Sequence, residues 1–93
     1  MTTADGGAQA DGNLQTDQTA RRKALAAALL ARRNELGVPQ REIIDRTPDL
    51  SRSQLQRLEQ AQTTVSVERL WSLALALDTT PSALLQAAEQ SLR

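Results

Sequence analysis

Apolar side chains recur at three- and four-residue intervals over residues 21–93, and this spacing predicts a series of short amphipathic helices. The first helix is expected from Arg21 to Leu36, with Gly37 as a natural terminator. Its inward positions are expected to be Leu25, Ala28, Leu29, Arg32 and Leu36.

Two shorter helices are predicted next, joined by a tight turn. The first spans Gln40 to Arg46, and Pro48 forces the chain out of it. Its inward side chains are Ile43 and Ile44. Ser51 and Gln54 have the spacing of a capping box, so the next helix should start at Ser51 and continue to Glu59.

The helix that starts at Ser51 has one apolar and one polar side. Leu55 and Leu58 fall on a single stripe at about 100° per residue. The opposite side carries Arg52, Ser53, Gln56, Arg57 and Gln60. Arginine can bind guanine, and glutamine adenine, through two-pronged contacts in the major groove. A DNA-reading face therefore competes with a simpler interpretation, the solvated side of an amphipathic helix.

Two further helices complete an all-α prediction. Ser66 can cap a helix, and Thr80 can cap another that has Pro81 at its first position. The expected inward stripe of the former is Val67, Leu70, Leu73, Ala74 and Leu77. The apolar positions of the latter are Leu84, Leu85, Ala88 and Leu92. The pattern predicts five helices and no convincing strand.

Composition narrows the possible functions. The 93 residues allow one small globular domain. They include no cysteine and no histidine, which removes disulfides, zinc fingers and the usual nucleophile pairs. Trp71 is the sole aromatic residue, so a base-stacking RNA platform is also excluded. We therefore expect no enzyme activity and no metal or other cofactor. No small-molecule ligand is evident from the sequence.

The sequence shows neither a membrane-length apolar stretch nor a secretion signal. We therefore expect no membrane partner and a cytoplasmic protein. Ten arginines against one lysine, with abundant alanine, hint at a bacterial or phage source.

Positive charge is concentrated on the helical part of the chain, although the formal net charge is zero. Residues 1–18 contain three aspartates and no basic residue, and their composition predicts a disordered acidic tail. Residues 21–93 hold all eleven basic residues against eight acidic ones, a balance of plus three. The alternative to a merely disordered tail is an autoinhibitory or solubilising tail that competes with DNA for the basic face of the helical domain.

The helix capped by Ser66 has more apolar surface than one small core requires. Trp71 and Leu75 lie one turn apart on a face next to the core stripe. The last helix could cover them, or two chains could meet around a twofold axis. The predicted dimer interface comprises Trp71, Leu75, Leu85 and Leu92.

The order of elements resembles the Cro/C1-type, or XRE, family of helix-turn-helix domains, to which the lambdoid repressors belong. The resemblance rests on RRNELGVPQREI, LSRSQLQRLE and SVERLWSLALALDTTPSALL. It implies a compact five-helix, lambda-repressor-like DNA-binding domain over residues 19–93, with the helix-turn-helix at about residues 40–60.

The same resemblance implies roles for individual residues. The expected base contacts come from Arg52, Ser53, Gln56 and Arg57. The expected phosphate contacts come from Gln40, Arg41, Ser51, Thr63 and Thr64. Arg33 and Glu59 are expected to form a partly buried ion pair.

Three departures from the family pattern affect the motif. The turn TPDLS is one residue longer than usual and lacks glycine, Ile44 replaces an alanine, and Ala61 stands where glycine often ends the recognition helix. These changes could shift how the helix docks.

The expected function is a sequence-specific regulator of transcription that binds double-stranded DNA, acting as a homodimeric repressor on a palindromic operator. One alternative is an antitoxin that represses its own operon and docks a protein partner. Another is an interaction module of the same fold that has lost DNA binding.

Overall fold

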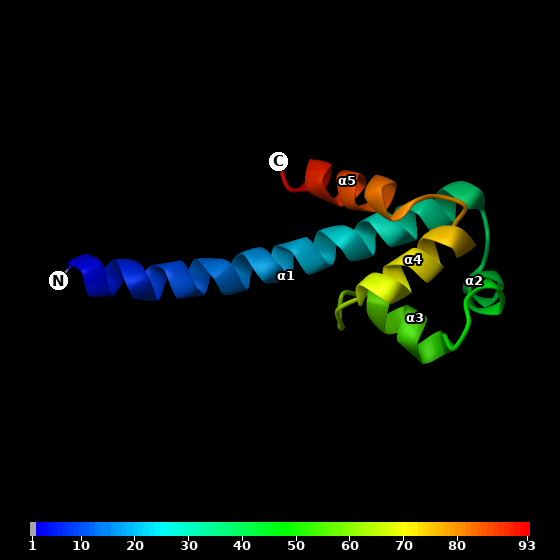
Figure 1. Cartoon of the computed structure of the whole chain (residues 1–93), viewed down its shortest axis with the longest axis horizontal. Coiled ribbons are helices and arrows are strands. Elements are labelled where there is room, and N and C mark those ends of the chain that lie inside the picture. The colour runs from blue at the N-terminus through cyan, green and yellow to red at the C-terminus, as the bar shows by residue number, and fades with distance from the viewer. Residues whose placement is uncertain (1) are drawn as a thin grey trace.

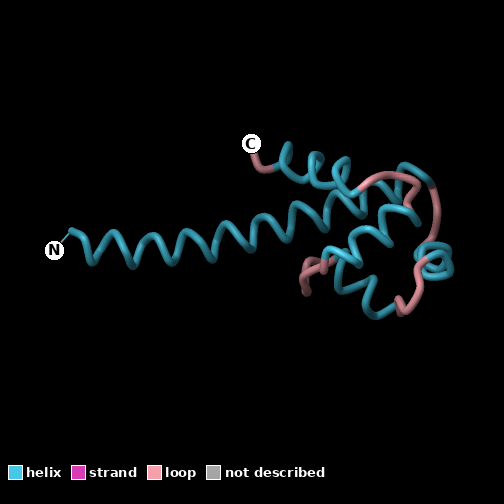
Figure 2. Tube along the Cα trace, viewed as in Figure 1, coloured by secondary structure: helices cyan, strands magenta, loops and turns pink. Residues whose placement is uncertain are grey.

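The structure, a computed structural model, describes the backbone of residues 2–93 and the side chains of residues 17–93. Within that part of the chain it contains five helices and no strand (Figures 1 and 2). They are α1 (Thr2–Leu36), α2 (Gln40–Arg46), α3 (Arg52–Glu59), α4 (Val67–Ala76) and α5 (Pro81–Ser91). The all-α, five-helix prediction is confirmed.

The N-terminal prediction is only partly addressed. The expected start of the first helix at Arg21 is wrong, because α1 begins at Thr2. The disordered tail expected over residues 1–18 stays a prediction, since the side chains of residues 1–16 lie outside the described part of the chain. Within the described side chains, Asp17 to Ala20 belong to α1. No glycine or proline stands between Asp17 and Gly37, so nothing in this stretch ends the helix before Leu36.

Helix ends follow the local signals in the sequence. Gly37 adopts a φ of 67° after α1, a left-handed conformation that glycine adopts without a Cβ clash. The Ser66 and Thr80 hydroxyls accept hydrogen bonds from the N–H groups of Arg69 and Ala83, both at 3.1 Å. These contacts satisfy orphan donors at the starts of α4 and α5.

A single apolar core lies where the helices meet, and it is built mostly from leucines. Its buried members are Leu29, Ile43, Leu50, Leu55, Leu58, Leu70, Leu73, Ala74, Ala76, Leu77 and Leu84. Each fully buried leucine or isoleucine contributes about 1.5–3 kcal/mol of transfer free energy. Helix α5 returns along α1, and α3 packs against both α1 and α2 (Figure 1).

Several expected core positions are wrong or incomplete. Val67 was placed inward, but it is 69% exposed, because it lies four residues before Trp71 on the outer stripe of α4. In α5, Leu84 and Ala88 are buried, whereas Leu85 and Leu92, which were assigned to a dimer interface and not to the core, are exposed. Ala24 and Ala26 join Leu29 as buried residues of α1, a wider stripe than the one predicted.

Candidate nucleic-acid interface

Helix α3 is anchored at its start and along its inner side. The Ser51 Oγ accepts a hydrogen bond from the Gln54 N–H at 3.1 Å, and the Gln54 Oε1 accepts one from the Ser51 N–H at 2.9 Å. This is the predicted capping box, with Ser51 as the N-cap residue. Leu55 and Leu58 are buried in the core. The orientation of α3 is therefore set by both its cap and its leucines.

The outer side of α3 presents polar side chains to solvent. Arg52, Ser53, Gln56 and Arg57 are all exposed. Among the described residues, none of these four side chains has a hydrogen-bond or ion-pair partner. Their donors and acceptors are therefore available to an external ligand.

A shallow depression of about 730 Å³ lies between α2 and the start of α3. Gln40, Arg41 and Arg52 line it, so the structure brings these three predicted DNA-contacting residues together. The Gln40 Nε2 donates to the Glu59 Oε1 at 2.8 Å, which commits one of its N–H groups inside the protein. Arg41 is exposed and free of such contacts within the described residues.

A second depression, of about 400 Å³, lies on the other side of α3, against the loop that leads to α4. Arg57, Thr63 and Thr64 line it, together with Ser66 and Arg69. Polar and basic side chains therefore flank the exposed face of α3 on both sides, and the depression beside α2 also contains the carboxylates of Glu42 and Asp45. That arrangement suits a groove reader whose neighbours contact the phosphates on either side.

Arg33 and Glu59 form the expected ion pair beneath this surface. The Arg33 Nε lies 2.7 Å from the Glu59 Oε2, and the Arg33 Nη2 lies 3.2 Å from the Glu59 Oε1. Their side chains are 16% and 8% exposed. Arg33 also donates to the Val38 carbonyl at 3.1 Å. The pair ties α1 to the end of α3, so Arg33 has a structural partner in place.

Sequence reasoning missed the role of Arg69. From α4 its guanidinium donates to the carbonyl oxygens of Pro48 and Asp49, at 3.0 and 3.2 Å. These carbonyls belong to the long turn between α2 and α3. Asp49 has a φ of 60°, the left-handed conformation that a glycine would otherwise supply. In the sequence, the polar residues of this turn were the only sign of a left-handed backbone conformation.

Two more arginines contact backbone carbonyls at the end of α4. Arg32 donates to the Leu77 and Asp78 carbonyls at 3.0 and 2.8 Å, and Arg46 donates to the Ala76 carbonyl at 2.9 Å. These cations satisfy the orphan acceptors of a helix C-terminus. They are engaged inside the fold, so the positive charge beside α3 comes chiefly from residues such as Arg41, Arg52 and Arg57.

The four predicted dimer residues divide into two exposed surfaces. Trp71 and Leu75 are 58% and 77% exposed and, with Val67, form the outer stripe of α4. Leu85 and Leu92 instead line a groove beside α5 that neither Trp71 nor Leu75 lines. None of the helices in the described residues is both long and apolar enough to cross a membrane.

Comparison with known proteins defines the class. A helix-turn-helix family model matches residues 29–84, more than half of the chain. The chain therefore belongs to this family, of Cro/C1 (XRE) type, and is a DNA-binding regulator of transcription. Proteins of this family and fold are in general not enzymes.

The chain is similar to a particular regulator of known structure. The crystal structure of the clp gene regulator ClgR from C. glutamicum matches with a TM-score of 0.74 and 34% sequence identity. The match covers 78% of the present chain and 94% of ClgR. A search of curated proteins found no match.

Proposed function

We propose that this protein is a sequence-specific repressor that binds a palindromic operator in double-stranded DNA as a homodimer. The observation that carries the proposal is the outer side of α3, whose polar side chains are free while its leucines are buried. A short helix held in this way can enter the major groove of B-DNA.

Each flank of α3 has its own part in the proposed complex. Arg52 and Arg57 contact guanines, Gln56 contacts adenine, and Ser53 is short enough for a close approach to the bases. Phosphate oxygens are bound from the two depressions that flank the helix, by Gln40 and Arg41 on one side and by Thr63 and Thr64 on the other. Ser51, the N-cap residue of α3, is proposed as a further phosphate contact from outside both depressions.

Dimerisation is supported by the exposed apolar surface. Trp71 and Leu75, which form the outer stripe of α4 with Val67, leave large apolar side chains in contact with water. A twofold pair of chains that meet through this stripe covers it and doubles the DNA contacts. The two copies of α3 then read half-sites about 10 base pairs apart.

Repression is the simplest action for such a dimer. Occupying a promoter duplex needs only the α3 surface and its flanks, because a bound protein blocks access to the same DNA. Similarity to a clp gene regulator supports control of gene expression by this chain.

The test is fluorescence anisotropy with a duplex from the upstream region of the protein's own gene. Arg52→Ala and Arg57→Ala are expected to weaken binding, each by about 1–3 kcal/mol. Lys23→Ala is the control, because it removes a positive charge on α1 outside both depressions.

Salt dependence gives a second measure. A dimer that neutralises about six phosphates should show a slope near −5 in a plot of log affinity against log salt concentration. A slope near zero in a folded protein would instead favour an interaction module without DNA binding. Sedimentation that finds only monomers, free and on DNA, would remove the homodimer from the proposal.

A further inference from the structure

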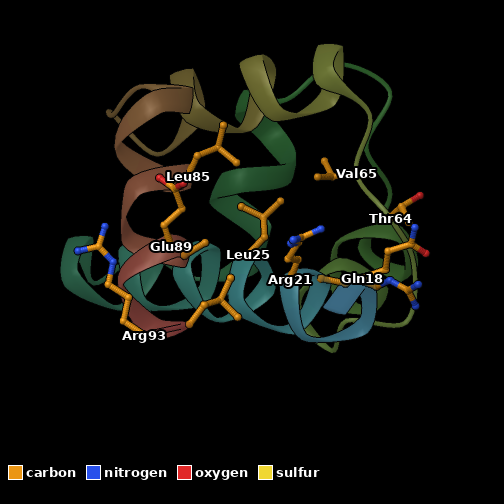
Figure 3. Close-up of a pocket in the computed structure, with 11 residues that line it drawn as sticks. Gln18, Arg21, Leu25, Thr64, Val65, Leu85, Glu89 and Arg93 are labelled. Carbon is orange, nitrogen blue, oxygen red and sulfur yellow. The ribbon is translucent and has the colours of Figure 1, made fainter. Parts of the chain in front are cut away.

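A groove of about 800 Å³ runs between α1 and α5 and reaches the loop before α4 (Figure 3). Apolar side chains make up much of its lining, namely Leu25, Val65, Leu85, Ala88 and Leu92. In Figure 3, Glu89 and Arg93 lie toward one end of the groove, and Gln18 and Thr64 lie toward the other. Its volume is within the range of about 300–1,000 Å³ that is typical of small-molecule sites.

The groove also carries positive charge that the protein does not neutralise. Arg21, Arg22 and Arg93 line it, against the single acidic side chain of Glu89. Within the described residues, none of these three arginines forms an ion pair. The groove therefore complements a ligand that is both apolar and negatively charged.

Arg22 adds a specific unsatisfied group. Its Nε is buried, and no hydrogen-bond acceptor reaches it among the described residues. Buried polar groups in folded proteins nearly always have a partner, and this donor, on a residue that lines the groove, has none within the described part of the chain. An anionic oxygen is the acceptor that best matches a guanidinium.

The groove is continuous with the proposed DNA-binding surface through one short loop. Thr64 and Val65 line this groove, and the same two residues line the depression that contains Arg57. A ligand that contacts Val65 from one side thus touches the segment that presents Thr63 and Thr64 to phosphates on the other.

We propose that the groove binds an amphipathic anion, with its apolar body against the leucines and its carboxylate or phosphate head held by Arg22 and Arg21. Binding repositions the loop at residues 63–65 and so changes affinity for DNA. This regulatory step rests on the proposed function, whereas the binding site itself does not. The rival occupant is a second copy of the chain, because the sequence alone also placed Leu85 and Leu92 in a dimer interface.

The first experiment measures binding without DNA, using decanoate as the probe and decanol as its uncharged counterpart. Calorimetry on the full chain is expected to show saturable binding of decanoate, with decanol weaker by about tenfold or more. Amide chemical-shift changes should fall on residues that line the groove. Equal binding of the two probes, or no saturable binding of decanoate below its micelle concentration, would overturn the site.

Variants separate a specific role of Arg22 from general charge. Arg22→Met keeps an apolar stem and removes the guanidinium, and it should weaken decanoate binding by about tenfold. Lys23→Met removes the neighbouring charge outside the groove and should bind decanoate like the parent protein. Removing an orphan buried donor should leave the melting temperature of Arg22→Met unchanged or higher, so lost binding would not reflect unfolding.

Sedimentation tests the rival occupant. If decanoate fails to bind and Leu85→Glu converts dimers to monomers, a second copy fills the groove and the ligand proposal is wrong.

A final experiment repeats the DNA titration with decanoate present. The DNA affinity of the parent protein should change, and that of Arg22→Met should not. Unchanged DNA affinity despite decanoate binding would refute the regulatory step alone. No DNA binding at all would refute that step and the proposed function together, while calorimetry would still decide the site.

Discussion

Arg33 in α1 and Glu59 at the end of α3 meet through two N–H···O contacts, at 2.7 and 3.2 Å, with both side chains largely withdrawn from solvent. Gln40, the first residue of α2, donates to the same carboxylate. One buried carboxylate therefore joins the three helices whose relative placement decides how α3 is presented. The proposed DNA-binding surface therefore depends on an ion pair that lies outside that surface.

Removing Arg33 should lower the stability of the protein more than removing an exposed arginine of α3 does. Arg33→Ala strands the Glu59 carboxylate, and we expect the free energy of unfolding to fall by about 3–5 kcal/mol. Arg52→Ala removes an exposed side chain and should cost less than about 0.5 kcal/mol of stability while weakening DNA binding. Urea denaturation and DNA titration of both variants measure the two effects. The opposite ranking of stabilities would contradict the assignment of Arg33.

Two serines that lie two residues apart at the start of α3 offer a matched pair. Ser51→Ala removes the cap of α3 and should destabilise the protein by about 1 kcal/mol. Ser53→Ala removes an exposed hydroxyl without a partner in the described residues, so its stability should be close to that of the parent protein. In DNA titrations, Ser53→Ala should lose affinity that its unchanged melting curve cannot explain. Equal melting temperatures for the two variants would argue against the capping box.

Ala61 occupies a backbone conformation that suits glycine. Its φ is 60°, immediately after the C-cap of α3, and its N–H bonds to the Leu58 carbonyl at 3.2 Å. Ala61→Gly should relieve the left-handed strain and stabilise the protein by about 0.5–1 kcal/mol. Ala87→Gly, in the exposed middle of α5, should instead destabilise it by about 1 kcal/mol. Thermal unfolding distinguishes these signs directly, and a shared sign would count against the prediction.

Arg69 should influence which DNA sequence is preferred. Arg69→Met removes both hydrogen bonds to the α2–α3 turn and should cost about 1 kcal/mol of stability. Because the turn sets the placement of α3, the variant should also change the ranking of operator variants in competition binding. Arg41→Met, which removes a proposed phosphate contact, should weaken all duplexes alike. Uniform weakening by Arg69→Met would show that its role is limited to charge.

Helix boundaries were largely predictable because their signals are local. The capping pair Ser51 and Gln54 lies within one turn of helix, and Gly37 ends the helix that precedes it in the chain. The predicted limits of α2 match the structure, and Ser66 and Thr80 cap the helices that were expected to follow them. Each of these features depends on neighbours only three or four residues away.

Other features required knowledge of distant partners. Arg46 contacts a carbonyl 30 residues away, and nothing in its local pattern separates it from an arginine that is free to bind a ligand. The spacing placed Arg32 on the inward stripe, but it could not name its partners, two carbonyls 45 and 46 residues away. Val67 was assigned to the inner stripe of α4, because its spacing fits both that stripe and the outer stripe that contains Trp71. The orphan Nε of Arg22 likewise has no signature in the sequence.

Periodicity and caps act over single turns, so the residues alone predicted the five helices, the polar outer side of α3 and the family, though not where α1 begins. Which arginines are engaged and which are free became clear only from the packing, because a guanidinium binds whichever carbonyl or carboxylate lies within reach. The packing also divides the exposed apolar side chains between a stripe on α4 and a groove beside α5. Such assignments depend on how helices far apart in the chain lie against one another.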